Sequence, residues 1–425
     1  MPLIDILSPL KGHIINIASI TFATAANNLM AFVIAILAAR KLGLEDFGIF
    51  SLALALGNLV GVVGDLGFNL SMIRLFNKYS TASEKQAQVI AATFGFKTFM
   101  FGGMLFLSIP FGGILTRYLD LGIENRSLFI SGFATGCLIF LWTFLQSYLQ
   151  SYRQFRTLAL FIWAYFGLRL LGLPFAYILF PESPLSWLAA TYTFPLMLLI
   201  AVGLVPQGIR LVPLAFKRPR ASLQALRELL AYGKWVALSV IAYTSMPHLL
   251  RFILAQRASL AEVGIFSAGM TFTVAFTTLN TAVRQVLFPQ VTALEGRERM
   301  KGYISKLATI GPYYFVFAAV GVTALGSLQW FVLGEQYRTA LPVFLITAGA
   351  LSGVCFLGLG NMLVHTVMKP EIDAWTNLAR LGLVTGLAFI IVPFFGAIGG
   401  AISYAIPLFI GEAWMFWYVQ HQYVQ

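Results

Sequence analysis

Apolar runs of about twenty residues follow one another along almost the whole chain, separated by short segments that carry Gly, Pro or clustered charges. A helix needs roughly 20 apolar residues to cross the hydrocarbon core of a bilayer. In lipid, backbone polar groups must find their partners inside the protein, so runs of this length predict spanning α-helices. Only 10% of the 425 residues are charged, which is too few to cover a soluble protein, where the share is about 25%.

Gly, Pro and charge clusters divide the chain into twelve expected spans, six in each half. The fold class is therefore all-α integral membrane. The expected spans are 13–39, 47–70, 87–115, 128–149, 158–180, 187–206, 233–256, 263–288, 304–333, 339–364, 375–395 and 397–419.

We expect an N-terminal lobe at 1–206, a cytoplasmic amphipathic linker at 207–232 and a C-terminal lobe at 233–425. From Ser222 the linker reads SLQALRELLAYGK, with leucines on one helical face and basic residues on another. This pattern is typical of a helix that lies on a membrane surface. The linker either floats at the interface or clamps an anionic lipid headgroup.

Lys and Arg gather in alternate loops, which predicts the orientation of the chain. With a cytoplasmic N-terminus, 17 of the 28 Lys and Arg lie in cytoplasmic segments and 6 lie outside. Cytoplasmic loops carry such an excess of basic residues. We therefore expect a multi-pass protein of the inner (plasma) membrane with both termini in the cytoplasm. The net charge of +12 is spread over these loops, so it does not predict binding to nucleic acid.

Two segments of the chain repeat one another. Ile36–Ser51 reads ILAARKLGLEDFGIFS and Ile253–Ser267 reads ILAQRASLAEVGIFS, and each joins the first two spans of its half. Six spans per half make the two halves enter the membrane in the same direction. We therefore expect two six-helix lobes related by a pseudo-twofold axis along the membrane normal, with a substrate cleft between them. This architecture favours a carrier over an enzyme.

The stretch AARKLGLEDFGIFSLALALGNLVGVVGDLGF (38–68) resembles the opening signature of the Wzx-type polysaccharide flippases, a branch of the multidrug/oligosaccharidyl-lipid/polysaccharide superfamily. Arg251 and the later segment Gly264–Ser267 resemble a second motif of that family, although Leu250 stands where an Asp is common. The resemblance implies alternating access around a cationic cavity. The implied cargo is an undecaprenyl-diphosphate-linked oligosaccharide (an O-antigen, capsule or exopolysaccharide unit), moved from the cytoplasmic to the periplasmic leaflet. Its implied partners are this substrate, membrane lipids and other polysaccharide-assembly proteins.

Four basic residues inside the expected spans are candidates for binding the anionic substrate. Lys97 and Arg169 lie deep in their spans, Arg251 lies near an outer end and Arg284 near an inner end. A charge at the bilayer centre costs roughly 2.5–3.5 kcal/mol on insertion scales, so a charge kept there needs a reason. We predict that these four residues form a cationic substrate-binding cavity.

Each of these cations also has a structural alternative. Lys97 can form a buried pair with Asp65 on the neighbouring span, and Arg169 can donate to helix carbonyls. Arg251 and Arg284 can extend to the headgroup layer. The same interfacial position is the alternative for Arg380, which we do not assign to the site. Besides Asp65, Glu412 is the other embedded acid, and an interfacial position explains it as well.

Polar side chains recur at helical spacing on the first, second, seventh and eighth spans, the pairs that the repeat relates. We expect them to line the cleft, whereas the alternative is hydrogen bonding between helices. The predicted polar lining is Thr24, Asn28, Asn58, Thr244, His248, Thr277 and Asn280.

The sequence predicts neither a cofactor nor a metal site, and Cys137 and Cys355 both lie in apolar runs. Coupling of transport to the membrane potential, H⁺ or Na⁺ is the remaining question. His can titrate near physiological pH, and an embedded acid can hold a cation. His248 and Asp65 are therefore the candidates for ion coupling.

No catalytic motif occurs, and no pair of carboxylates is expected at working distance, so the chain is not expected to be an enzyme. Two other functions stay open. A cation-coupled multidrug exporter of the same superfamily would need acids in its cleft. A membrane-embedded glycan ligase or polymerase would need a long periplasmic loop with catalytic Arg or His.

Overall fold

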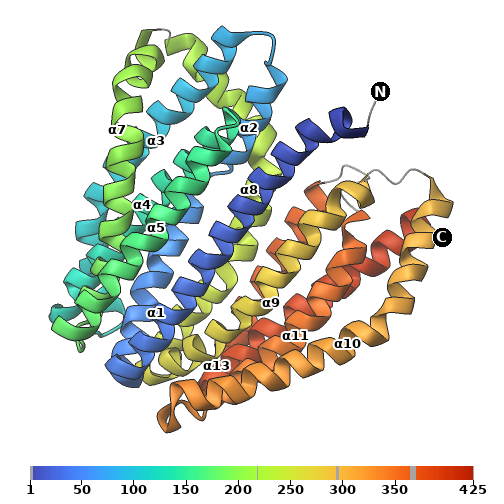
Figure 1. Cartoon of the computed structure of the whole chain (residues 1–425). Helices are drawn as coiled ribbons and strands as arrows, with labels where there is room; N and C mark the ends of the chain where they lie inside the picture. The colour runs from blue at the N-terminus through green and yellow to red at the C-terminus, as the bar shows by residue number, and fades with distance from the viewer. Residues whose placement is uncertain (1–2, 218, 293–295, 364–369, 425) are drawn as a thin grey trace. The chain divides into compact units, whose positions relative to one another are not determined.

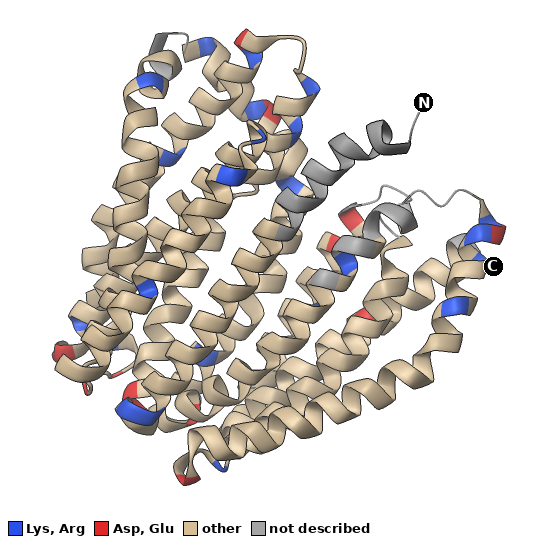
Figure 2. Cartoon of the chain, viewed as in Figure 1, with Lys and Arg blue, Asp and Glu red and all other residues tan. Residues whose placement is uncertain are grey.

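The computed structural model describes residues 3–217, 219–292, 296–363 and 370–424, nearly all of them helical (Figure 1). No β-strand occurs in these ranges. Figure 2 shows that Lys, Arg, Asp and Glu gather toward the helix ends, while the middle stretches of the helices carry few of them. The predicted all-α membrane fold is confirmed.

The chain forms two compact units that do not follow the chain order throughout. The first unit consists of Met1–Ile34 and Leu56–Ala237, and the second consists of Ala35–Ala55 and Leu238–Gln425. A short piece of the first half of the chain, 35–55, thus belongs to the second unit. The predicted linker, 207–232, is helical at its described residues, 207–217 and 219–232, and lies within the first unit. The predicted division into lobes at 1–206 and 233–425 stays a prediction.

The first unit is built around a buried apolar core. The helices α3, α4 and α7 pack on one another, and α5 packs beside α4 and α7 (Figure 1). Phe140, Phe144 and Leu204 lie in this core. The first unit includes parts of α1 (Leu3–Asp65) and of α8 (Pro219–Arg257). Its other helices are α2 (Phe68–Lys78), α3 (Ser83–Tyr118), α4 (Arg126–Ser151), α5 (Phe155–Pro174), α6 (Pro184–Leu188) and α7 (Phe194–Lys217).

In the second unit α11 packs against both α9 and α13, and α10 lies beside α11 (Figure 1). Phe272 of α9 and Phe344 of α11 are fully buried and meet in an edge-on ring contact. Besides residues from 238 onward of α8, the helices of this unit are α9 (Leu260–Thr292), α10 (Arg297–Leu333), α11 (Ala340–Asn361) and α13 (Pro370–Val419).

Two helices are too long to be single spans. The 63 residues of α1 would extend about 95 Å at 1.5 Å per residue, about three times the hydrocarbon thickness. Its helical geometry breaks at Gly43 (φ 78°), and that of α13 breaks at Gly396 (φ 51°). Only glycine adopts such backbone angles without strain. Within the described residues, ten helices are long and apolar enough to span, and these two breaks raise the number of spans to the twelve expected.

The two repeat segments meet in the second unit through a reciprocal contact. A side-chain carbon added at Gly48 would lie against the carbonyl oxygen of Leu260, and one added at Gly264 would lie against the carbonyl oxygen of Leu44. The glycines are 216 positions apart in the sequence, and so are the leucines. The two repeat copies therefore pack against each other symmetrically. In each copy a glycine lies against a backbone carbonyl of the other copy.

Glu262, the acid of the second repeat copy, caps the second arm of α13. Its Oε2 accepts a hydrogen bond of 2.6 Å from the backbone N–H of Ala397, directly after the break at Gly396. A helix start leaves N–H groups unsatisfied, and a carboxylate there also complements the helix dipole.

We expect Glu262→Ala to lower the free energy of unfolding by about 0.5–2 kcal/mol, the usual cost of losing a helix cap. Denaturant unfolding in detergent micelles measures this. Glu298→Ala is the control, since Glu298 is an exposed acid in the first turn of α10. Equal effects of the two substitutions would contradict the capping role.

Candidate functional site

The basic residues buried in the spans fall into two groups, according to whether a carboxylate neutralises them. Lys97 belongs to the first group. Its side chain is fully buried, its Nζ lies 2.6 Å from Oδ1 of Asp65, and the ammonium lies over the ring of Phe140 at 4.2 Å. A lysine with no exposed surface and a salt bridge is not available to a substrate. The structure therefore places Lys97 in the alternative role foreseen for it, a buried pair.

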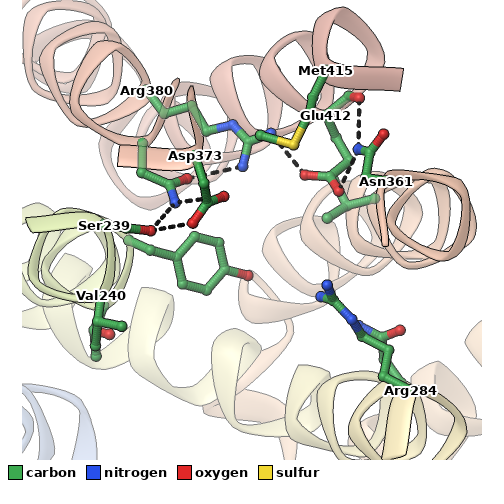
Figure 3. Close-up of a pocket in the computed structure, with 13 residues that line it drawn as sticks. Ser239, Val240, Arg284, Asn361, Asp373, Arg380, Glu412 and Met415 are labelled. Carbon is green, nitrogen blue, oxygen red and sulfur yellow. Dashed lines mark hydrogen bonds and ion pairs between the residues drawn. The ribbon is translucent and has the colours of Figure 1, made fainter. Parts of the chain in front are cut away.

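Arg380 also has a carboxylate partner, on the other arm of α13. Its Nη2 lies 2.7 Å from Oε2 of Glu412, and its Nη1 donates to Oδ1 of Asn377 at 3.0 Å (Figure 3). Both ionic side chains are almost completely buried. Gly411 leaves room for the guanidinium, because a Cβ there would collide with the Arg380 side chain. The interfacial alternative given for Arg380 and Glu412 is wrong, because the two residues pair inside the second unit.

Arg169 has no carboxylate partner among the described residues. It is 3% exposed, and it donates from Nε to the carbonyl of Thr191 at 3.1 Å and from Nη1 to that of Asn27 at 3.3 Å. Thr191 lies in a π-helical turn, Ala189–Thr193, and the rings of Tyr165 and Tyr192 lie beside the guanidinium. Nη2 is buried without a hydrogen-bond partner. The structure thus leaves a positive charge and one free donor deep in the first unit.

Arg251 is held by neutral groups in the second unit. Its Nε donates to Oγ of Ser267 and its Nη1 to the carbonyl of Pro247, both at 2.9 Å. Nδ1 of His248 lies 3.4 Å from the same Nη1. Pro247 lacks the N–H that would continue the helix ladder, and its own carbonyl is taken by the arginine. No carboxylate in the described part of the chain neutralises Arg251.

Arg284 reaches into a polar cavity of about 230 Å³ in the second unit. Figure 3 shows its guanidinium pointing across the cavity toward Glu412 and Asn361. No hydrogen bond or ion pair joins this guanidinium to another of the described residues. The lining residues come from α8, α9, α11 and both arms of α13: Ser239, Val240, Tyr243, Thr244, Asn280, Arg284, Val354, Asn361, Asp373, Asn377, Arg380, Glu412 and Met415.

A continuous hydrogen-bond network forms the wall that faces Arg284. Asp373 accepts from the hydroxyl of Ser239, and Asn377 donates to the same hydroxyl oxygen at 2.9 Å. The network continues through Arg380 to Glu412, whose Oε1 accepts from Nδ2 of Asn361 at 2.8 Å. Side chains tied together in this way are held in fixed positions before any ligand arrives.

Among the predicted lining residues, the structure brings Thr244 and Asn280 together with Arg284 in the cavity. His248 contacts Arg251 instead. Thr277 is exposed and bonds back to the carbonyl of Val274 in its own helix. The lining roles of Thr24, Asn28 and Asn58 stay predictions; Thr24 is exposed and the other two are partly buried.

Sequence reasoning missed the polar residues of the α13 arms and their neighbours. Asp373, Asn377 and Arg380 follow one another at spacings of four and three, which places them on one helical face. This pattern at the start of a span was a usable signal. Asn27 was also missed: its Nδ2 donates to the carbonyl of Ile162 at 2.7 Å, next to Arg169.

A second pocket, of about 140 Å³, lies in the first unit near the start of α8. The hydroxyl of Tyr79 donates to Oε2 of Glu228 at 2.6 Å, and the ammonium of Lys85 lies 5.3 Å from the Tyr79 ring centre. The hydrogen bond to Glu228 raises the pKa of Tyr79, with burial adding to the effect. The pocket thus ties the predicted amphipathic segment to the start of α3. No group of three metal-ligating side chains occurs in the described residues.

Comparisons with known proteins agree with this architecture. The sequence profile of the family described as "Polysaccharide biosynthesis protein" matches residues 14–295. A Shigella flexneri protein named "Putative O-antigen transporter" is 22% identical over 388 residues, which cover 89% of this chain and 91% of that protein.

Two solved structures share the fold. A lipid II flippase, MurJ, in an inward closed conformation matches with a TM-score of 0.74 at 12% identity, covering 94% of this chain and 87% of that one. An inward-facing MATE family multidrug resistance transporter of the MOP superfamily matches with a TM-score of 0.70 at 15% identity, covering 96% and 97%. At these identities the likeness shows the fold alone.

Proposed function

The chain belongs to the polysaccharide biosynthesis protein family, and we propose that it is a flippase for a lipid-linked oligosaccharide. The cargo would be an undecaprenyl-diphosphate-linked unit of O-antigen, capsule or exopolysaccharide, moved from the cytoplasmic to the periplasmic leaflet by alternating access. The protein would lie in the inner membrane with both termini in the cytoplasm, as the distribution of Lys and Arg predicts. The Shigella relative's name supports this cargo class.

One observation carries the proposal: Arg169, Arg251 and Arg284 have no carboxylate partner in the described part of the chain, whereas Lys97 and Arg380 are neutralised. Positive charge kept inside a membrane protein is expensive, so it marks a functional site. A diphosphate is the complementary charge. A drug exporter that holds organic cations would need the opposite balance of embedded charges.

The physical task explains why a protein is needed. Sugar hydroxyls and a diphosphate cannot cross lipid unaided, because each unsatisfied polar group costs several kcal/mol in hydrocarbon. A carrier supplies replacement hydrogen bonds while the prenyl chain stays in the bilayer. An inside-negative potential favours outward movement of an anion by roughly 2.3 kcal/mol per charge per 100 mV. The membrane potential is therefore the driving force that we propose.

Coupling to H⁺ or Na⁺ stays a prediction. The two candidates for it, Asp65 and His248, are held by Lys97 and Arg251 respectively. A carrier rather than an enzyme also fits the short connections, such as that between Arg257 and Leu260. Such connections leave no space for the catalytic loop of a glycan ligase or polymerase.

We expect Arg169→Gln, Arg251→Gln and Arg284→Gln each to reduce flipping about tenfold or more, because a hydrogen bond to a charged group contributes roughly 1.5–3 kcal/mol. The measurement is the distribution of lipid-linked oligosaccharide between leaflets, in cells whose native gene is replaced by the variant. Loss of function should trap the glycolipid on the cytoplasmic side.

Lys301→Gln serves as the control, since Lys301 is an exposed base at the start of α10. It should leave flipping unchanged. Accumulation on the periplasmic side would indicate a ligase or polymerase instead. An unchanged glycolipid distribution in all three arginine variants would reject the flippase proposal.

A further inference from the structure

The polar cavity of the second unit has features that suit one particular part of such a substrate. Resting on the flippase function proposed above, we propose that this cavity binds the single sugar ring attached to the diphosphate, with Arg284 on the phosphate and the ring hydroxyls on the opposite wall. The substrate would thus be recognised by its first sugar, and not by charge alone.

The wall opposite Arg284 is rich in fixed hydrogen-bond acceptors. Asp373 and Glu412 have oxygen atoms with lone pairs beyond those used in the network, because an ionised carboxylate offers about four acceptor sites. Ser239, Asn361 and Arg380 hold these carboxylates in place. Sugar hydroxyls are donors that match such acceptors, and a site built to bond a hydroxyl rejects ligands that lack it.

The charges of the cavity disfavour a bare diphosphate as its ligand. The lining holds two bases, Arg284 and Arg380, and two acids, Asp373 and Glu412, so it carries no net charge. Arg380 is already neutralised by Glu412, which leaves Arg284 for an anion. A diphosphate filling the whole cavity would lie against the two carboxylates. A ligand with one anionic end and a neutral hydroxylated end matches both walls.

The size of the cavity limits the ligand to one ring. Its volume of about 230 Å³ is below the range of about 300–1,000 Å³ typical of sites for drug-sized molecules. Tyr243, Thr244 and Asn280 complete the lining on α8 and α9. An oligosaccharide chain would have to extend out of the cavity, so its distal sugars would not contact the residues that line it.

Occupancy of the cavity can be measured through the reactivity of a cysteine in its wall. Val240 lines the cavity and is 50% exposed, whereas the native Cys137 and Cys355 are buried. The rate of maleimide labelling of Val240→Cys would be measured in purified protein. Each measurement would be made in the presence of one compound: glucose 1-phosphate, N-acetylglucosamine 1-phosphate, methyl glucoside or inorganic pyrophosphate. A glycosyl phosphate should slow labelling about tenfold when present at ten times its Kd. Methyl glucoside and pyrophosphate should protect less.

Two variants sharpen the test. Leu223→Cys lies on the same helix with 52% exposure outside the cavity, so its labelling should be unaffected by every probe. Adding Arg284→Gln to Val240→Cys should remove the advantage of glycosyl phosphate over methyl glucoside. Equal protection by pyrophosphate, or protection by no probe, would overturn the sugar subsite.

The outcome for the subsite can be separated from that of the flippase proposal. Absent protection together with trapped cytoplasmic glycolipid in the Arg284→Gln cells would reject the subsite and keep the flippase. Protection by glycosyl phosphate, with an unchanged glycolipid distribution in all three arginine variants, would keep the subsite and reject the flippase.

Discussion

Arg380→Met should destabilise the protein by about 3–5 kcal/mol, because it removes one partner of a buried ion pair. The Glu412 carboxylate would then stay buried without its cation, 2.7 Å from where the guanidinium had been. The pair also joins the two arms of α13, each partner lying sixteen residues from Gly396. Its loss should therefore loosen the packing of this helix pair. Thermal or denaturant unfolding in detergent micelles gives the change in stability.

Two comparisons isolate the cause of this effect. The double variant Arg380→Met with Glu412→Leu should recover much of the lost stability, since an apolar pair of similar volume replaces a buried ion pair at little cost. Arg338→Met should cost less than about 1 kcal/mol, because the Arg338–Glu335 pair is exposed at 55% and 85%. An Arg380→Met protein as stable as the parent would show that the pair is not needed to hold the arms together.

The spans and the repeat could be predicted from the sequence because both are patterns of residue type along the chain. A long apolar run predicts a spanning helix from its own residues, because the backbone of such a helix is hydrogen-bonded within the segment. The pair Lys97–Asp65 was foreseeable as an alternative, since the two residues lie on consecutive spans. The sequence does not decide between substrate binding and the buried pair, because the choice depends on how exposed Lys97 is in the folded protein.

The pairing of Arg380 with Glu412 does not follow from the depth of each residue in its own span. Each lies near a predicted span end, which suggests an interfacial position. Almost no loop separates the last two spans, between Phe394 and Gly400. Such a short connection makes the arms antiparallel neighbours, so residues equidistant from Gly396 must meet. The signal available in the sequence was that Arg380 and Glu412, which have opposite charges, lie at equal distances from Gly396.

The surroundings of Arg169 show a different limit. The sequence offered carbonyl bonding as the alternative for Arg169, and the structure shows two such bonds, to the carbonyls of Thr191 and Asn27. The partner residue on α1 could not be predicted, because neighbouring residues on a helix point about 100° apart. Asn28 was chosen from the spacing of a polar stripe, whereas Asn27 supplies the carbonyl that Arg169 binds.

We expect Gly48→Val and Gly264→Val each to destabilise the second unit, toward the upper end of about 1–3 kcal/mol for overpacking. In both cases the atom in the way is a backbone carbonyl oxygen, of Leu260 or Leu44, which cannot turn aside as a side chain can. Gly349→Val is the matched control, since it lies in helix α11 with no atom within 4 Å of an added Cβ. Denaturant unfolding in micelles measures all three.

The double variant tests whether the two glycines serve one contact. Because each repeat copy presses on the other at the same crossing, the first valine should already force the segments apart. The second valine should then cost much less, so the double variant should fall short of the sum of the single effects. Contacting sites show such coupling, whereas independent sites add within about 0.3–0.5 kcal/mol. Additive losses would mean that Gly48 and Gly264 act in separate contacts and that the repeat does not form a reciprocal one.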